Sequence, residues 1–253
     1  MKKKFKDYKQ PRQLTKINYL KNIFNFKKSF IIYKSPNGFD LYTDFSKKVV
    51  LTNKNIEKFI KRTNKKKSKL KDTDIFIGFF GYEILNNLIG IKIKKRKNLK
   101  FPKGIFYKPE TKIKLSNKLN YKPETPIKPN KSFKVNLSKT SYTNIFNKFI
   151  KKIRCGETYQ IKICTKYKNK SKIDPLDFFC RLTKTNIAPE AFMIKDKDYS
   201  IISCSPENLI TKKKDFISTK PIAGTLKKIK NLNKTKALAF FKKNIKESKE
   251  HNM

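Results

Sequence analysis

The sequence of 253 residues predicts an α+β fold, in which antiparallel sheets are flanked by helices. Three observations support this prediction. Short segments rich in β-branched and aromatic residues occur near the N-terminus and again after residue 190, separated by turns. Apolar residues repeat at helical spacing between residues 145 and 153, and the closing segment is also helical in character. Strands that follow one another through short turns pair antiparallel.

Two strands are expected near the N-terminus. Residues 29–33 are mostly apolar and aromatic, a Pro-Asn-Gly turn follows at 36–38, and residues 40–43 continue the strand pattern. Residues 76–83 are apolar and contain two glycines, which indicates that backbone segments approach each other closely there.

The clearest candidate boundary lies near the middle of the chain. Residues 111–131 are rich in proline, lysine and asparagine, a composition typical of a linker. This segment would separate an N-terminal region, residues 1–110, from a second domain, residues 132–253.

Beyond this boundary the local signals are sharper. The apolar residues of 145–153 have serine and threonine upstream as caps and Gly156 just past the end, so a helix is predicted. Residues 159–163 alternate between apolar and polar, which predicts a strand. Asp174-Pro175 is a favourable helix start, with the aspartate as cap and the proline in the first turn.

Four short strands are expected next, joined by charged turns as in an antiparallel meander. They are 191–194, 199–204, 209–211 and 216–220. A last helix is predicted to begin near Asn233.

The formal net charge of +45 at pH 7 would ordinarily indicate nucleic acid or an anionic membrane as partner. Only five of the 64 basic residues are arginine, however, and the lysines are spread along almost the whole chain. Residues with A/T-rich codons are abundant and those with G/C-rich codons are scarce. We interpret the charge mainly as the imprint of an A/T-rich genome, and a physiological nucleic-acid partner is not expected. A basic nucleic-acid-binding protein stays the alternative from a different functional class.

The four cysteines form no Cys-x-x-Cys pair and the chain has a single histidine, His251. Neither a zinc site nor a disulfide framework is indicated, which favours a reducing compartment. The most apolar stretch, residues 75–91, is interrupted by polar side chains and does not predict a membrane span. We therefore expect a cytoplasmic protein with no membrane partner.

The motifs that carry chemistry lie in the second half of the chain. They are Ser205-Pro-Glu207, Lys220-Pro-Ile-Ala-Gly-Thr225 and the segment Lys246-Glu-Ser-Lys-Glu-His251, preceded by Gly156-Glu-Thr-Tyr-Gln160, Asp174-Pro175-Leu176 and Ala188-Pro189. In this order and spacing they resemble the chorismate-utilising enzymes, which include anthranilate synthase component I and aminodeoxychorismate synthase component I. Phe79-Phe-Gly-Tyr-Glu83 matches the N-terminal region of these enzymes more loosely.

The resemblance implies the antiparallel fold of chorismate-binding enzymes and Mg²⁺ as cofactor. It places the catalytic acid at Glu207, where a protonated carboxyl would help the ring hydroxyl of chorismate to leave. It assigns one magnesium ligand to Glu250. Gly224 and Thr225, with Ala223 before them, would hold a substrate carboxylate. Without the resemblance, the residues alone favour a solvent-facing glutamate at Glu207, an ordinary turn at Gly224-Thr225 and a helix surface at Glu250.

Two positions bear on the reaction within this resemblance. Gln160 stands where the water-using members carry a lysine base, which favours ammonia as the nucleophile. Ala223 stands where aminodeoxychorismate synthases typically carry a lysine that attacks the substrate, and an alanine methyl cannot form that adduct. Anthranilate synthase, in tryptophan biosynthesis, is therefore favoured. Aminodeoxychorismate synthase, in folate biosynthesis, is the alternative, and Tyr159-Gln160 and residues 203–205 favour it.

In this resemblance residues 1–110 correspond to the N-terminal region of an anthranilate synthase component I, and residues 132–253 to the first part of a chorismate-binding domain. The family continues with Arg-Asn-Asp and Gly-Ala-Pro-Lys segments and a second magnesium-binding glutamate, which the 253 residues do not contain. We therefore expect an incomplete fold that is inactive alone. The implied partners are chorismate, a glutamine amidotransferase subunit as ammonia source, and a separate chain carrying the missing half.

Overall fold

The computed structural model describes residues 29–63, 73–91, 101–116, 118–119, 121, 132–213, 215–222, 224–227, 229 and 231–252. The chain consists of two compact units. The first comprises residues 1–121 together with 179–253, and the second comprises residues 122–178. The predicted α+β class with antiparallel sheets is confirmed, because strands and helices occur together and every strand pair is antiparallel.

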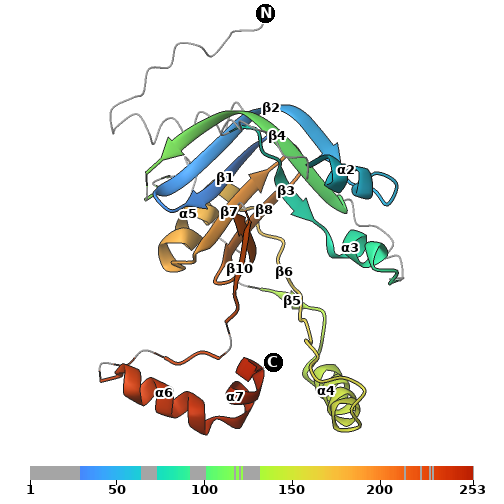
Figure 1. Cartoon of the computed structure of the whole chain (residues 1–253), viewed down its shortest axis with the longest axis vertical. Coiled ribbons are helices and arrows are strands. Elements are labelled where there is room, and N and C mark those ends of the chain that lie inside the picture. The colour runs from blue at the N-terminus through green and yellow to red at the C-terminus, as the bar shows by residue number, and fades with distance from the viewer. Residues whose placement is uncertain are drawn as a thin grey trace, which may run out of the picture. The chain divides into compact units, whose positions relative to one another are not determined.

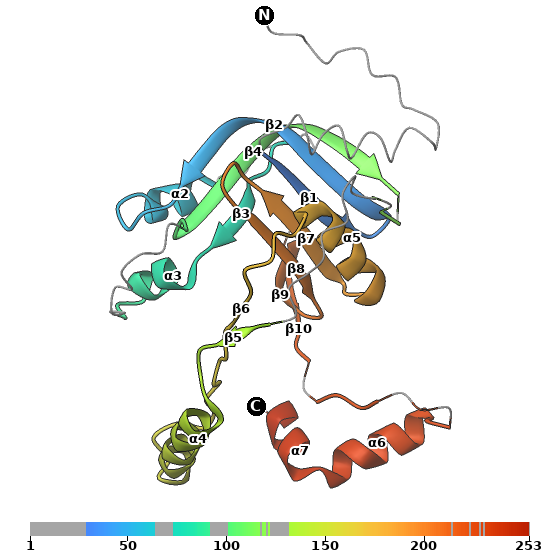
Figure 2. The same cartoon turned by 180° about the vertical axis from the view of Figure 1, so that it is seen from behind.

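A six-stranded sheet forms the centre of the first unit, with the strand order β3-β4-β2-β1-β7-β8 (Figure 1). The longest strands, β2 and β4, are strongly curved, as the view from behind also shows (Figure 2). The six strands are β1 (Phe30–Ser35), β2 (Gly38–Val50), β3 (Ile77–Phe80), β4 (Gly104–Leu115), β7 (Glu190–Lys195) and β8 (Ser200–Ser205).

The first hairpin follows directly from its sequence. Pro36 and Asn37 form the turn between β1 and β2. Gly38 has a φ of 135°, a backbone conformation that residues other than glycine rarely adopt. Ser35 pairs with Gly38 across the turn. The strands and the turn predicted in this part of the chain are therefore confirmed.

Apolar residues on one face of the sheet form one core cluster of the first unit. Five buried side chains cluster there, with partly buried aromatic rings packed around them: Ile31, Tyr42, Ile105, Tyr107 and Ile194. A smaller cluster of Leu51, Ile56 and Ile84 anchors two short helices, α2 (Ile56–Thr63) and α3 (Tyr82–Leu88). Burying such side chains contributes about 1.5–3 kcal/mol each.

One buried carboxylate ties the strands of this sheet together. Asp196, which follows β7, accepts hydrogen bonds from Lys48 Nζ and Tyr107 Oη, both at 2.6 Å. Ser29 Oγ and the Lys197 amide donate to its other oxygen, both at 2.8 Å. Burial alone would raise the pKa of Asp196, but these hydrogen bonds outweigh it and the pKa lies below its usual range. The folded state therefore prefers the ionised carboxylate.

The two glycines of residues 76–83 lie against the backbone, as the sequence indicated. Gly78 pairs with Phe106 of β4, and a Cβ at Gly78 would stand 1.9 Å from Ile105 O. A Cβ at Gly81 would stand 2.2 Å from Lys103 O. Side chains at either position would therefore force β3 away from β4.

The predicted linker at 111–131 is partly wrong. Residues 111–115 form the end of β4 and pair with β2, from Leu115 opposite Phe39 to Thr111 opposite Thr43. Pro109 lies opposite Phe45, where the register shifts, and a bulge of this kind lets a strand accommodate a proline. Most of the remaining linker residues, 122–131, lie outside the described residues.

The chain also does not divide into the predicted regions 1–110 and 132–253. β7 pairs with β1 from Phe30 opposite Lys195 to Tyr33 opposite Phe192, so strands from both regions share one sheet. Contacts of this kind join residues far apart in sequence, and local composition carries no signal for them.

In the second unit, helix α4 (Lys139–Arg154) confirms the helix predicted at 145–153. Ser138 Oγ caps its N-terminus by accepting from the Ser141 amide at 3.1 Å, and Gly156 has a φ of 74° just beyond its end. Two short strands, β5 (Lys134–Val135) and β6 (Tyr167–Lys168), pair with each other. The strand predicted at 159–163 is wrong, because this segment pairs with no strand among the described residues.

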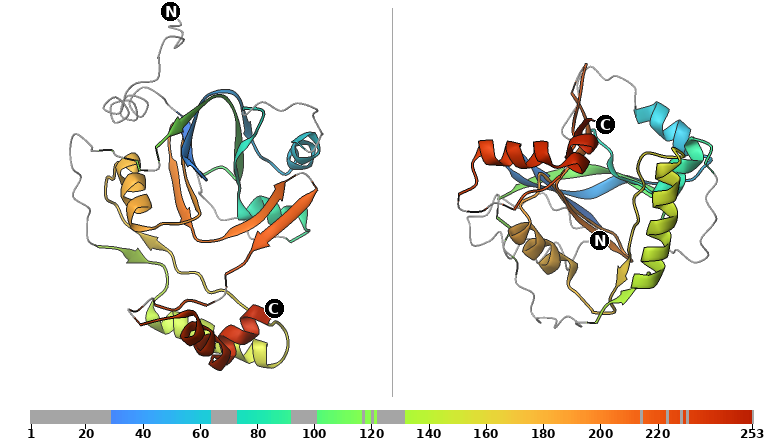
Figure 3. Two further views of the ribbon diagram at one scale, coloured as in Figure 1. Left: turned by 60° about the vertical axis from the view of Figure 1, so that its left-hand side comes forward. Right: turned by 90° about the horizontal axis from the view of Figure 1, so that it is seen from below.

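Helix α5 (Pro175–Thr185) crosses the boundary between the units, and Asp174 caps it as predicted. A separate two-stranded sheet, β9 (Asn208–Lys213) and β10 (Phe216–Lys220), follows β8 (Figure 3). Asn233 caps helix α6 (Lys234–Lys243), and a break at Asn244 separates it from helix α7 (Ile245–Asn252). None of the helices in the described ranges is both long and apolar enough to cross a membrane.

Candidate functional site

Glu207 lies in the short connection between β8 and β9. The Ser205 hydroxyl donates to the Glu207 carbonyl at 2.9 Å and accepts from the Glu207 amide at 3.3 Å, which fixes the turn around Pro206. The Glu207 side chain is exposed, and its Oε1 accepts a hydrogen bond from the Ile222 amide at 3.2 Å. The predicted acid is therefore held against the segment that carries Gly224 and Thr225.

A second carboxylate anchors this turn from the sheet. Glu190, at the start of β7, accepts from the Tyr33 hydroxyl at 2.5 Å and from Asn208 Nδ2 at 2.9 Å. Burial, followed by the hydrogen bond to Glu190, raises the pKa of Tyr33 above its usual range, so the tyrosine stays a donor. Asn208 is the residue after Glu207, so Glu190 fixes the backbone of the acid. Sequence reasoning missed Glu190, because a glutamate after a proline carries no sign of its distant partners.

Gly224 provides the next link. Its φ of 73° is in the left-handed region, which explains why a glycine stands there. A Cβ at Gly224 would lie 2.3 Å from Glu247 Oε2 and 2.9 Å from Phe241 Cε1. The loop after β10 therefore packs directly against α6 and α7, and it does so at the glycine that the sequence singled out.

Glu247 and Glu250 form a carboxylate pair on α7. Lys246 Nζ lies 3.3 Å from both Glu247 Oε1 and Glu250 Oε2. These hydrogen bonds, led by that of Glu247, raise the pKa of the exposed Lys246 ammonium. Glu247 Oε2 is buried and no hydrogen-bond donor faces it within the described part of the chain. A buried carboxylate oxygen without a hydrogen-bond partner is unusual in a folded protein and requires an explanation.

The carboxylate pair fits a magnesium ion in part. Mg²⁺ prefers oxygen ligands and is commonly held by one or two carboxylates, with water and substrate oxygens completing its shell. Glu247 and Glu250 supply two carboxylates one turn apart, and the orphaned Glu247 oxygen marks where a cation would be favourable. Within the described ranges no group of three or more His, Cys, Asp or Glu residues is arranged to hold a metal. A cation there therefore depends on oxygens from water and substrate.

The other predicted site residues are less constrained. Thr225 is exposed, directly after Gly224. Gln160 is exposed in the second unit, where its carbonyl accepts from Thr158 Oγ1 at 3.2 Å. Ala223 lies outside the described residues. The structure thus brings together Glu207, Gly224 and the α7 carboxylates, and it describes Gln160 only within its own unit.

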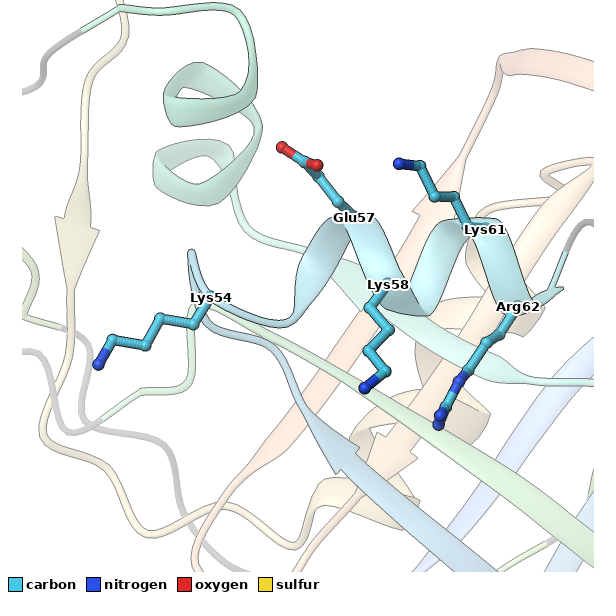
Figure 4. A pocket seen from close by; sticks show the side chains of 5 residues that line it. All are labelled: Lys54, Glu57, Lys58, Lys61 and Arg62. Carbon is cyan, nitrogen blue, oxygen red and sulfur yellow. The ribbon is translucent and has the colours of Figure 1, made fainter.

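A separate basic hollow of about 370 Å³ lies beside α2. Its lining comes from the helix and the turn before it: Lys54, Glu57, Lys58, Lys61 and Arg62. Lys58 and Arg62 point to one side of the helix, and Glu57 and Lys61 point to the other (Figure 4). Four cations with one carboxylate would attract small anions or phosphate chains weakly, because exposed lysines remain solvated.

Comparison with known proteins places this arrangement in a family. The model of the chorismate binding enzyme family matches residues 28–253, which is most of the chain and includes all three site segments. The chain belongs to the chorismate binding enzyme family. The matched residues also span the predicted linker, in agreement with the single sheet to which both sides contribute.

Curated relatives are similar over part of the chain. Anthranilate synthase component 1 of Mycolicibacterium smegmatis is 31% identical over 103 residues, covering 38% of this chain and 20% of that protein. Aminodeoxychorismate synthase component 1 of Bacillus subtilis is 28% identical over 108 residues, covering 43% and 23%. Anthranilate synthase component 1 of Saccharolobus solfataricus is 32% identical over 90 residues, covering 36% and 21%. The matches to this chain therefore span about a fifth of these relatives.

Proposed function

We propose that this chain supplies the acid and one carboxylate-binding face of an ammonia-using chorismate enzyme of the anthranilate synthase component I type. One observation carries the proposal. The Glu207 carboxylate contacts the Ile222 amide, and two residues further on Gly224 packs against Glu247. Three segments that are separate in sequence are therefore linked by contacts, which supports a common site.

The proposed reaction converts chorismate and ammonia into anthranilate, pyruvate and water. The Glu207 carboxyl, in its protonated form, donates its proton to the ring hydroxyl as the carbon–oxygen bond breaks, and the hydroxyl leaves as water. Ammonia forms the new carbon–nitrogen bond at the ring. Loss of the enolpyruvyl side chain as pyruvate then leaves the aromatic product.

The loop residues would bind and orient the substrate. Gly224 exposes its backbone without a Cβ, and Thr225 adds a hydroxyl, so this segment is suited to a carboxylate. Magnesium, when bound, would neutralise the ring carboxylate of chorismate. Glu250, with Glu247 beside it, would hold that ion, and the buried Glu247 oxygen supports this assignment.

Anthranilate is the favoured product because Ala223 cannot act as a covalent nucleophile. The alternative is aminodeoxychorismate, because a relative named for that reaction is also similar to this chain. The two products differ in one measurable way. Anthranilate formation releases one pyruvate per turnover, whereas aminodeoxychorismate keeps the enolpyruvyl group.

The test combines the chain with a polypeptide that supplies the rest of such a domain, together with chorismate, ammonium and Mg²⁺. Anthranilate is followed by fluorescence and pyruvate by coupling to lactate dehydrogenase. We expect both signals from the combined protein and none from this chain alone, since an exposed acid does not exclude water from the substrate. Glu207→Gln should abolish both signals, and Glu110→Gln, an exposed glutamate on β4, should not. Full activity of Glu207→Gln would refute the assignment of the acid.

The relatives are components of two-component synthases by name, and we propose a glutamine amidotransferase subunit as the ammonia source. Glutamine would then replace ammonium only when that subunit is present. All four cysteines are free thiols, which supports a reducing cytoplasm as the site of the reaction.

The alternative from a different class is nucleic-acid binding, and the basic hollow beside α2 is the feature that favours it. This alternative predicts an affinity for nucleic acid that falls steeply as the salt concentration rises and that chorismate does not change. Tight binding of single-stranded RNA at physiological salt, with no binding of chorismate, would replace the proposed function.

A further inference from the structure

The ammonium group of Lys246 lies at the point that the two carboxylates of helix α7 share. Its Nζ is 3.3 Å from Glu247 Oε1 and 3.3 Å from Glu250 Oε2. Because one nitrogen contacts an oxygen of each side chain, these two oxygens face a common volume. The carboxylate pair is therefore arranged around a single cation position, and a side chain of the chain itself occupies that position.

The other oxygen of Glu247 is closed off by the packing of the loop. Glu247 Oε2 is buried, and a Cβ at Gly224 would stand 2.3 Å from it and 2.9 Å from the ring of Phe241. This uncompensated oxygen adds negative potential to the pair. Mg²⁺, however, usually keeps several water ligands in a near-octahedral shell. A hydrated ion therefore reaches the pair from the side of Glu247 Oε1 and Glu250 Oε2, where Lys246 lies.

Lys246 is held less firmly than the carboxylates that it contacts. Its side chain is 78% exposed, whereas those of Glu247 and Glu250 are 16% and 30% exposed. An exposed ion pair contributes little to stability, because the ammonium stays hydrated and salt screens the attraction. Lysine also has a flexible four-carbon stem, so its ammonium can leave the pair without any change in the backbone. A second cation can thus replace it while both carboxylates stay in place.

We propose that Lys246 is an internal competitor of the metal ion. Its ammonium neutralises the pair of Glu247 and Glu250 when no ion is bound, and it moves into solvent when Mg²⁺ binds. This inference rests on the proposed function, which assigns the ion to these carboxylates. A divalent ion carries twice the charge of an ammonium and contacts carboxylate oxygens directly, so the exchange is favourable once enough Mg²⁺ is present.

The competition has a consequence for the substrate. Lys246 lowers the affinity of the free chain for Mg²⁺, because part of the binding free energy is spent on displacing the ammonium. A substrate carboxylate that also contacts the ion favours the metal-bound state over the Lys246-bound state. Since such coupling is reciprocal, Mg²⁺ and chorismate should each strengthen the binding of the other.

The test measures metal affinity in the full 253-residue chain, with Mn²⁺ as a probe that prefers the same oxygen ligands as Mg²⁺. Free Mn²⁺ is quantified from its electron paramagnetic resonance signal. Lys246→Met removes the ammonium and keeps an unbranched side chain. It should tighten Mn²⁺ binding by about three- to tenfold, the factor expected when two exposed ion pairs no longer compete. Displacement of Mn²⁺ by Mg²⁺ should show that Mg²⁺ binding tightens as well.

Lys249→Met is the matched control. Lys249 is exposed on the same helix, and the ion pairs of Glu247 and Glu250 found in the described part of the chain are with Lys246. Both substitutions remove one positive charge, so general electrostatic effects are nearly equal. At physiological ionic strength Lys249→Met should change the affinity by less than about twofold. Lys246→Arg keeps a cation and should not tighten binding, whereas Glu250→Gln should weaken it.

Three results would overturn the proposal. Equal tightening by Lys246→Met and Lys249→Met would show an effect of net charge alone. Weaker binding by Lys246→Met would show that the ammonium orders the carboxylates for the ion. Undetectable Mn²⁺ binding, or binding that Glu250→Gln leaves unchanged, would show that the pair is not the metal position. None of these measurements involves turnover, so full activity of Glu207→Gln would refute the proposed function without altering them.

Discussion

Gly224→Ala should uncouple the loop after β10 from helix α7. An alanine at a φ of 73° costs about 1–2 kcal/mol in backbone strain. Its Cβ would also stand 2.3 Å from Glu247 Oε2 and 2.9 Å from Phe241 Cε1, and overpacking of this kind costs about a further 1–3 kcal/mol. The contact is thus expected to weaken by about 2–5 kcal/mol. Hydrogen–deuterium exchange of residues 241–252 reports this local opening directly.

Gly90→Ala is the matched control for the backbone strain of an alanine at positive φ. Gly90 has a φ of 78°, and a Cβ there would meet no atom within 4 Å. Its effect should be limited to about 1–2 kcal/mol of strain, with no change in exchange of α7. The difference between the two alanine variants isolates the clash with Glu247 and Phe241.

A double-mutant cycle tests the partner. Glu247→Ala removes the oxygen that the new Cβ would meet, so Gly224→Ala should cost at least about 1 kcal/mol less in that background. If Gly224→Ala behaves like Gly90→Ala, or if the Glu247→Ala background changes nothing, then the loop does not pack on α7. The carboxylate pair would then lose its link to Glu207.

Three further changes have defined outcomes. Gly78→Ala should destabilise the first unit by at least about 2 kcal/mol in urea titrations, since its Cβ would stand 1.9 Å from Ile105 O. Asp196 has a lowered pKa in the folded state, so its stabilisation is present above the unfolded value of about 4 and is lost as pH falls below it. Asp196→Asn should reduce the loss of unfolding free energy at acidic pH. An unchanged pH dependence would contradict the role of the hydrogen bonds to Asp196. Glu190→Ala frees Asn208, so exchange at residues 205–209 should quicken while Tm falls by only a few degrees.

Local signals in the sequence predicted local structure correctly. The cap expected from the serines and threonines before residue 145, the Asp174-Pro175 helix start and the turn at residues 36–38 each act within a few residues. The structure has all three, with Ser138 as the cap. The segment at 159–163 has equally good alternation, but a strand also needs a neighbour to pair with, and none of the described strands serves it. Periodicity reports a propensity, whereas pairing is a property of the whole chain.

The linker was predicted to begin at residue 111, within β4, for the same reason on a larger scale. Lysine and proline in residues 108–115 suggest exposure, yet β4 runs through them because β2 supplies a partner and a bulge near Pro109 absorbs the irregularity. The pairing of β1 with β7 joins residues more than 150 positions apart, as the bond from Tyr33 to Glu190 illustrates. A single sequence carries no signal for such contacts.

Some residues of the candidate site could be predicted from the sequence, and others could not. Glu207, Gly224 and Glu250 were identified from motif order, and the structure joins the first two to a common loop and helix. The burial of Glu247 Oε2 could not be predicted from the sequence. A glutamate three residues before Glu250 is also expected when the helix is fully exposed to solvent. Ala223, which favours anthranilate as product, is a sequence argument only.

The contacts of Glu207 differ between its two sides. Behind the acid, Glu190 holds Asn208 and is itself held by Tyr33, so the turn is fixed to the six-stranded sheet. On its other side, the contact found among the described residues is an exposed hydrogen bond from the Ile222 amide, at the end of the β9–β10 hairpin. An acid must be held both against its substrate and away from bulk water to transfer a proton efficiently. The Glu190 anchor supplies the first of these two requirements, so Glu190→Ala should impair the proposed proton transfer by Glu207 even though the carboxyl itself is retained.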